Sequence, residues 1–301
     1  MFDDHVKTSF RVSRGGAAAL SAMNRTMMGR VGALFDSSFY INLGDDWICI
    51  GSEALSLGPL NVRSSAPASI HWPSSGLAMG DRVLIAAGTA HVGSHFDFSL
   101  SDALAWKAVA PVGWTAGSAQ AGLGHLDKLL PQFDAGDGLA AFARNRPVPK
   151  LVNSVVDASR DSITLLATAL EHDEFRAGVI AKAATRLIGL GPGLTPSGDD
   201  FLGGMMIALH TIGREEAAAS LWTSVAPHLE TRTSAISRAH LRAAATGSGH
   251  EALHAILGNL LRGESDSLRD NLNRIEAIGH SSGWDTLAGM LTVLRTIYGP
   301  E

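Results

Sequence analysis

A glycine- and proline-rich stretch in the second half of the chain constrains its fold more than any other. It begins at Leu187, ends at Leu209 and reads Leu-Ile-Gly-Leu-Gly-Pro-Gly-Leu-Thr-Pro-Ser-Gly-Asp-Asp-Phe-Leu-Gly-Gly-Met-Met-Ile-Ala-Leu. The alternating glycines at its start predict a loop, because ordering glycine costs too much entropy for helix and strand interiors. From Phe201 onward, apolar residues recur at helical spacing. The stretch therefore predicts a tight bend that leads into a helix with a buried face.

The start of this predicted helix is unusually polar. Ser197 is the predicted N-cap, and Asp200 occupies the position where a capping box carries a carboxylate. Asp199 adds a charge that capping does not need, and Gly203-Gly204 predicts close packing or binding, since each glycine inside a helix costs roughly 1 kcal/mol relative to alanine. Backbone amides, small side chains and carboxylates at a helix start are typical of anion or metal–phosphate sites. A well-capped turn without a ligand is the alternative.

Composition bounds the class of protein. The 301 residues, 46% of them hydrophobic, suffice for a substantial core, and we predict two domains. The net charge of −5, without a dense run of Lys or Arg, argues against nucleic acid or an anionic membrane as a partner. The N-terminus has no signal-peptide pattern, and no run of about 18 apolar residues predicts a membrane span. The single cysteine, Cys49, excludes an internal disulfide, so we predict a cytoplasmic protein.

The first part of the chain has a β-like pattern. Short runs of strand-forming residues lie between Gly, Pro, Asp and Ser turns, at residues 39–43, 47–50, 69–72 and 82–85. Gly44-Asp45-Asp46 is the predicted hairpin connection between the first two runs, and residues 15–31, rich in Ala and Met, are predicted to be a helix packed on the sheet. This spacing favours a small antiparallel sheet or barrel over a parallel βαβ array.

Beyond Pro111 the pattern becomes helical. Ala, Leu, Arg and Glu at three-four spacing, with Gly or Pro between the runs, predict helices at residues 119–130, 151–172, 174–188, 199–213, 214–229, 231–246, 250–262, 265–279 and 283–298. We therefore predict an α+β protein, with a β-rich N-terminal domain at residues 1–132, a linker at 133–149 and an α-helical domain at 150–301.

Two further helix starts in the predicted α-helical domain are polar. At residues 230–234, Arg232 offers a bidentate fork suited to carboxylate or phosphate. At residues 279–285, His280 is the best candidate for proton transfer, since imidazoles in general titrate near neutrality. In the alternative interpretation, the hydroxyl and carboxylate groups of both stretches are only caps and Arg232 is solvated. We predict that the three polar helix starts converge on one pocket.

Other patterns are weaker. His250-Glu251-Ala252-Leu253-His254 matches the zinc-peptidase pattern His-Glu-x-x-His, but no further histidine follows at the spacing of the extended pattern. Because Gly247-Ser248-Gly249 precedes it, His250 is predicted to lie on a fraying first turn, and we interpret the match as an ordinary helix start. Residues 91–97, which carry two histidines and an aspartate, are interpreted as a surface loop. Cys49, between Ile48 and Ile50, is interpreted as a small buried hydrophobe.

On the residues at 189–204 and 279–285, the chain resembles the AllH-like subunit family of oxamate carbamoyltransferase. The turn Leu57-Gly58-Pro59-Leu60 and the strand entry Asp81-Arg82-Val83 look similar too. The resemblance implies a transferase subunit that acts beside other subunits in anaerobic allantoin breakdown, a branch of purine degradation. The implied reaction moves a carbamoyl group between oxalurate and phosphate to give oxamate and carbamoyl phosphate, from which a carbamate kinase would recover ATP.

Oxamate and carbamoyl phosphate are small anions, whose transfer chemistry needs electrostatic clamping more than a covalent nucleophile. We predict that the anion binds at the helix start near Ser197. The predicted substrate-binding residues are Gly191, Gly193, Leu194, Thr195, Ser197, Gly198, Arg232, Thr233, Ser234 and Ser282, and the predicted catalytic residues are His280, Asp199 and Asp200.

The carboxylates beside this predicted anion site leave two arrangements open. Either Asp199 and Asp200 turn outward as caps, or a divalent cation such as magnesium bridges them to phosphate. The sequence establishes no cofactor. Two alternatives to a carbamoyltransferase subunit also stay open. One is a non-catalytic structural or regulatory subunit, and the other is a zinc-dependent hydrolase that uses His250 and His254.

Overall fold

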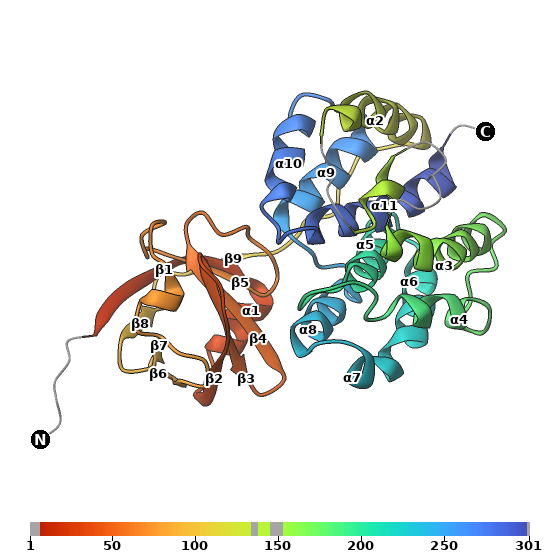
Figure 1. Ribbon diagram of the computed structural model, residues 1–301. Coiled ribbons are helices and arrows are strands. Elements are labelled where there is room, and N and C mark those ends of the chain that lie inside the picture. The colour runs from red at the N-terminus through yellow and green to blue at the C-terminus, as the bar shows by residue number, and fades with distance from the viewer. Residues whose placement is uncertain (1–6, 134–137, 145–152, 300–301) are drawn as a thin grey trace, which may run out of the picture. The chain divides into compact units, whose positions relative to one another are not determined.

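The computed structural model describes residues 7–133, 138–144 and 153–299, and the chain divides into two compact units, residues 1–107 and 108–301 (Figure 1). The first unit is β-rich and the second is helical, which confirms the predicted α+β class. Helix α2 (Ala116–Leu129) belongs to the second unit, whereas the sequence placed these residues in the first domain. The predicted linker at 133–149 lies only partly within the described residues.

The strands of the first unit close into a small barrel. They are β1 (Thr8–Gly16), β2 (Met27–Leu34), β3 (Ser38–Leu43), β4 (Asp46–Ser52), β5 (Asn61–Ser64), β6 (Arg82–Ala86), β7 (Thr89–Val92), β8 (Phe96–Ser99) and β9 (Leu104–Trp106). Their hydrogen-bonded order is β5-β4-β3-β2-β6-β7-β8-β1, and pairing of β1 with β5 closes the ring. Most neighbouring strands are antiparallel. Strands β8 and β9 each pair with β1 in parallel, and β4 pairs with β5 in parallel. The barrel is therefore mixed rather than purely antiparallel.

The tight turn between β3 and β4 follows directly from the sequence. Leu43 pairs with Asp46, which leaves Gly44-Asp45 as a two-residue connection. Gly44 has a φ of +73°, a conformation that glycine adopts without a steric penalty. The predicted hairpin is confirmed.

Two sequence predictions in the first unit need correction. Residues 69–72 are not a strand, because they lead into a short 3-10 helix, Trp72–Ser74, that carries Trp72 into the barrel core. There the Trp72 ring packs on Phe39, with ring centroids 4.7 Å apart. The helix predicted within residues 15–31 is only α1 (Ala17–Met23), since strands β1 and β2 take up the rest.

The second unit is a helical bundle in which α5 occupies the centre (Figure 1). Besides α2, its helices are α3 (Ser154–Glu171), α4 (Ala177–Leu187), α5 (Ser197–Thr211), α6 (Glu215–Val225), α7 (Leu229–Arg232), α8 (Ala235–Ala244), α9 (Glu251–Arg262), α10 (Leu268–Glu276) and α11 (Ser282–Tyr298). Every helix predicted from the sequence has a counterpart among them. From Phe201 to Leu209, α5 is buried on all sides, as expected of a helix that is apolar all round. None of the helices that the structure describes has the length and apolar content to cross a membrane.

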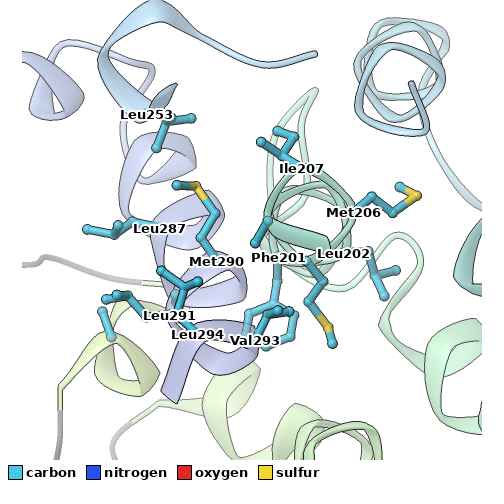
Figure 2. Packing of buried hydrophobic residues seen from close by; sticks show 14 of the residues in the cluster. Phe201, Leu202, Met206, Ile207, Leu253, Leu287, Met290, Leu291, Val293 and Leu294 are labelled. Atoms are coloured by element: carbon cyan, nitrogen blue, oxygen red, sulfur yellow. The ribbon is translucent and has the colours of Figure 1, made fainter. Parts of the chain in front are cut away.

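Helices α5 and α11 pack backbone to backbone. A Cβ atom at Gly204 would lie 2.0 Å from the carbonyl oxygen of Thr286, and one at Gly289 would lie 2.0 Å from that of Phe201. Apolar side chains from both helices, including Phe201 and Met290, gather around this contact (Figure 2). The close approach predicted at Gly204 is therefore packing between two helices, and it places the start of α11 beside the start of α5.

Candidate functional site

The bend between α4 and α5 depends on three glycines in left-handed conformations. The φ angles of Gly189, Gly191 and Gly193 are +72°, +113° and +92°, respectively, a region that other residues rarely adopt. A Cβ atom at Gly189 would also lie 2.2 Å from the carbonyl oxygen of Arg232. The bend is exposed at Pro192, Gly193 and Leu194, so apolar side chains do not cover it.

Several backbone amides of this bend are unsatisfied. Within the described part of the chain, the N–H groups of Gly191, Gly193, Leu194 and Thr195 donate to no acceptor. Successive free amides around glycines of positive φ form a concave nest that binds anions. The first turn of α5 follows at once and adds the partial positive charge of a helix start. The local chemistry of the bend thus suits an anionic group.

Ser197 begins α5 but does not cap it, which corrects the sequence prediction. The N-cap is Pro196, and neither a side-chain cap nor a capping box with Asp200 is formed. The physical reason is that the amides that a cap would satisfy are already bonded. The Gly198 amide donates to the Leu190 carbonyl at 2.9 Å. The Asp199 amide donates to the Pro196 carbonyl, also at 2.9 Å.

Asp199 turns inward and ties three segments together. Its carboxylate accepts hydrogen bonds from the Gly189 amide at 2.8 Å, from the Ser237 hydroxyl at 2.7 Å and from the Thr233 hydroxyl. The residue is only 1% exposed. Burial raises the pKa of Asp199, and the three hydrogen bonds oppose that rise. Asp199 therefore positions the bend against α8, and it does not turn outward as a cap.

Asp200 and Asp285 place two unsatisfied carboxylate oxygens in the interior. Asp285, on α11, is fully buried, and its Oδ1 accepts from the Leu139 amide at 2.6 Å. The Oδ2 atoms of both aspartates are shielded from solvent and have no hydrogen-bond partner among the described residues. Burial raises the pKa of Asp200 well above its usual value. A hydrogen bond to the Ser282 side chain lowers this pKa, and the negative charges of Asp285 and Asp199 raise it further.

Hydroxyl groups join the other helix starts to the bend. The Oγ1 of Thr195 and the Oγ of Ser282 lie 2.8 Å apart and link the bend to the first residue of α11. The Ser234 hydroxyl donates to the Leu194 carbonyl and also caps α8 by accepting from the Ser237 amide at 3.0 Å. The starts of α5, α8 and α11 therefore meet at the bend, and the pocket predicted between them stays a prediction.

Arg232 and His280 lie at the margin of this arrangement. The guanidinium of Arg232 is exposed and donates to the Thr185 carbonyl on α4 at 3.1 Å, so it contacts that helix rather than the amides of the bend. His280 is exposed in the turn before α11. Anion binding by Arg232 and proton transfer by His280 stay predictions.

The other histidine patterns are resolved differently. His250 is the N-cap of α9 and lies outside the helix, and the Nε2 of His254 accepts from the Gly249 amide at 3.0 Å. This departs from the zinc-peptidase arrangement, in which both imidazoles project from one helix. No group of three or more His, Cys, Asp or Glu residues in the described ranges is arranged to hold a metal ion.

Residues 91–97 are not simply a loop. His91 lies in β7 and hydrogen-bonds through Nδ1 to Asp97 at 2.8 Å, so the predicted surface loop is confined to the turn between β7 and β8. Cys49 is buried in β4, and burial raises the pKa of its thiol to about 12. A thiol of this kind is a poor nucleophile, in agreement with the prediction of a small buried hydrophobe.

The anchoring role of Asp199 gives a first testable prediction. Asp199→Asn should lower the free energy of unfolding by about 1–3 kcal/mol, because the amide group can no longer accept all three hydrogen bonds. Urea unfolding followed by circular dichroism measures the change. Asp161→Asn removes the same charge from an exposed position on α3 and should have little effect. Equal stability of the two variants would contradict the anchoring role.

The family model described as oxamate carbamoyltransferase subunit AllH matches residues 187–294. This segment of the chain is AllH-like. The matched segment, about a third of the chain, starts at the last residue of α4 and ends within α11. It therefore contains the bend and the three converging helix starts. The resemblance inferred from residues 189–204 and 279–285 is confirmed, and no solved structure matches the chain.

Sequence reasoning missed part of the candidate site. Asp285 belongs to the stretch at 279–285, where it was interpreted only as a cap. The signal that could have found it is its position one turn into a glycine-flanked helix, which matches the position of Asp200. Ser237 and Leu139 were not singled out. No local pattern marks them, because each acts on an aspartate far away in the sequence.

Proposed function

We propose that this AllH-like chain is a subunit of an oxamate carbamoyltransferase-like enzyme that binds a small anionic substrate on the bend before α5. The substrate class is oxamate or oxalurate together with phosphate or carbamoyl phosphate. One observation carries the proposal. The free amides of Gly191, Gly193, Leu194 and Thr195 form an exposed nest inside the segment that matches the family model.

In this proposal the protein acts by positioning and electrostatics. The nest amides bind the anionic group, and the starts of α5 and α11 supply partial positive charge. The hydroxyls of Thr195 and Ser282 orient the remaining polar atoms of the substrate. Carbamoyl transfer also needs the second reactant and stabilisation of the charge that develops on it, and we assign these contributions to partner subunits.

Filling the nest tests the proposal. A Cβ atom at Gly191 would lie 2.9 Å from the Ser197 amide nitrogen, whereas one at Gly193 would meet nothing within 4 Å. Both residues have positive φ, so alanine strains the backbone at either position, but only Gly191→Ala obstructs an amide. Gly191→Ala should bind oxamate or phosphate about tenfold more weakly than the wild type, which corresponds to the loss of about one hydrogen bond. Gly193→Ala should bind these anions more tightly than Gly191→Ala does.

Isothermal titration calorimetry of the full chain with oxamate, phosphate and carbamoyl phosphate measures these affinities. Circular dichroism of both glycine variants establishes that they are folded. Binding that is reduced equally in the two variants would indicate backbone strain rather than a blocked nest. If the wild-type chain gives no heat with any of the three anions, the proposed binding role fails and a structural or regulatory subunit is the better description.

A further inference from the structure

The floor of the bend holds three carboxyl groups without a counter-cation. Asp199, Asp200 and Asp285 lie close enough for the charges of the first and third to act on the second. None of them forms an ion pair with a Lys, Arg or His residue in the described part of the chain. Asp199 receives three hydrogen bonds that compensate an ionised carboxylate. Asp200 and Asp285 also receive hydrogen bonds, but each keeps one oxygen without a partner among the described residues.

The surroundings of Asp200 and Asp285 do not suit two negative charges. Facing Asp200 are Asp199 on its own helix and Asp285 and Ser282 on α11, and facing Asp285 are the Leu139 amide, Ser197 and Ser281. These neighbours include no cation. Each aspartate also keeps one solvent-shielded oxygen that accepts no hydrogen bond. An ionised oxygen in that state costs several kcal/mol, and a proton on one of the two carboxyls removes most of the cost.

The backbone at Gly138 encloses this pair further. A Cβ atom there would lie 2.5 Å from Oδ1 and 2.8 Å from Oδ2 of Asp285, and 2.9 Å from Oγ of Ser197. The backbone therefore packs directly on the carboxyl group, and Oδ2 is closed to solvent from this side. A proton needs far less room beside such an oxygen than a solvated cation does.

We propose that Asp200 and Asp285 together retain one proton at neutral pH and that an anionic ligand on the bend binds together with this proton. The pair then carries a single negative charge beneath the nest, so an anion meets less repulsion than three ionised aspartates would produce. A bound anion in turn raises the proton affinity of the pair, because binding and protonation are linked. At a pH where the ligand-free pair has lost this proton, binding of the anion takes it up from solvent, and no bond other than O–H forms. The ligand-binding half of this inference rests on the proposed function, and the retained proton does not.

Infrared spectroscopy of the full chain without ligand tests the retained proton. The wild-type protein at neutral pH should show the C=O stretch of a protonated, buried carboxyl group. Asp200→Asn and Asp285→Asn should each shift or remove this band, because each takes away one of the two carboxyls that hold the proton. Asp199→Asn should keep it. Absence of the band from the wild type, or an unchanged band in both Asp200→Asn and Asp285→Asn, would overturn the proposal.

Calorimetry tests the link to the ligand. Oxamate is the probe, since its carboxylate does not titrate near neutral pH. Oxamate titrations in two buffers of different ionisation enthalpy, at a pH above that at which the ligand-free pair loses its proton, should reveal proton uptake by the wild type and none by Asp200→Asn. The wild-type affinity should also fall by up to about tenfold per pH unit once the pH exceeds that at which the pair ionises, whereas Asp200→Asn should show a flat pH profile.

The two readouts separate the possible failures. The band without any oxamate binding leaves the proton pair standing and rejects the proposed function. Oxamate binding without the band rejects the proton pair and leaves the proposed function standing. Binding with the band but without proton uptake rejects the coupling between the two.

Discussion

Replacing Gly204 by alanine is expected to destabilise the helical unit by about 3 kcal/mol or more. The added Cβ atom would lie 2.0 Å from the Thr286 carbonyl oxygen, which belongs to the backbone of α11 and cannot rotate away. Helices α5 and α11 would have to separate, and their apolar contacts would loosen (Figure 2). Urea unfolding measures the effect when it is followed by circular dichroism at about 222 nm, where the helix signal dominates.

The neighbouring glycine is a matched control. A Cβ atom at Gly203 would meet the Ala244 Cβ at 3.5 Å and nothing closer, which is an ordinary contact. Gly203→Ala should therefore stabilise the protein by roughly 1 kcal/mol through better helix propensity. Two identical substitutions at adjacent positions are expected to act in opposite directions. If both destabilise α5 to a similar degree, the backbone contact with α11 is not the cause.

Lowering the pH is expected to destabilise the helical unit through a group of packed histidines. His240 on α8 stacks on His250, with ring centroids 5.8 Å apart, and His254 follows one turn into α9. Burial lowers the pKa of His250 to about 3 and those of His240 and His254 to about 4 each. The value for His250 also includes the effect of the charges that His240 and His254 would acquire.

The sign of this effect follows from the direction of the shifts. The unfolded chain protonates these rings near the ordinary value of 6.5, whereas the folded chain does so only near pH 3–4. Their contribution to stability is therefore complete above pH 6.5 and is lost as the pH falls toward the folded values. At about pH 5, the loss should amount to about 2 kcal/mol for His250 alone.

His250→Phe isolates this contribution, because it keeps a flat ring against His240 but cannot bind a proton. Chemical unfolding of both proteins at about pH 7 and about pH 5 measures the change in stability between the two conditions. The variant should lose about 2 kcal/mol less than the wild type. Any packing difference between the two rings is present at both pH values and cancels. An identical loss in the two proteins would show that His250 does not titrate as proposed.

Much of the fold could be predicted because its signals are local. Long runs at helical spacing located the helices of the second unit, and Gly44-Asp45 located a hairpin. Closure of the barrel could not be predicted, since the pairing of β1 with β5 and β8 joins segments far apart in the sequence. Residues 69–72 were predicted to be a strand, because a short apolar run gives the same pattern in a strand and in a loop with a buried anchor. Here the anchor is Trp72.

In the candidate site, too, local features could be predicted and long-range contacts could not. The polar starts of α5, α8 and α11 were visible in the sequence, and the contacts of Thr195 with Ser282 and of Asp199 with Thr233 bring them together. The prediction of Ser197 as the N-cap was wrong, because backbone carbonyls already accept hydrogen bonds from the amides that a serine cap would satisfy. The raised pKa of Asp200 comes first from its burial and also from the charge of Asp285, 85 residues further on, and no local pattern predicts either cause.

Closure of the barrel also limits how the first unit can associate with other proteins. An open sheet offers unpaired backbone groups along its outermost strands, and a foreign chain can extend the sheet there. In the described ring of β1 to β8, each strand has a neighbour on both sides, and only β9, three residues long, ends the series. Recruitment of this unit into a larger assembly should therefore proceed through complementary side chains on its outer wall rather than through strand addition.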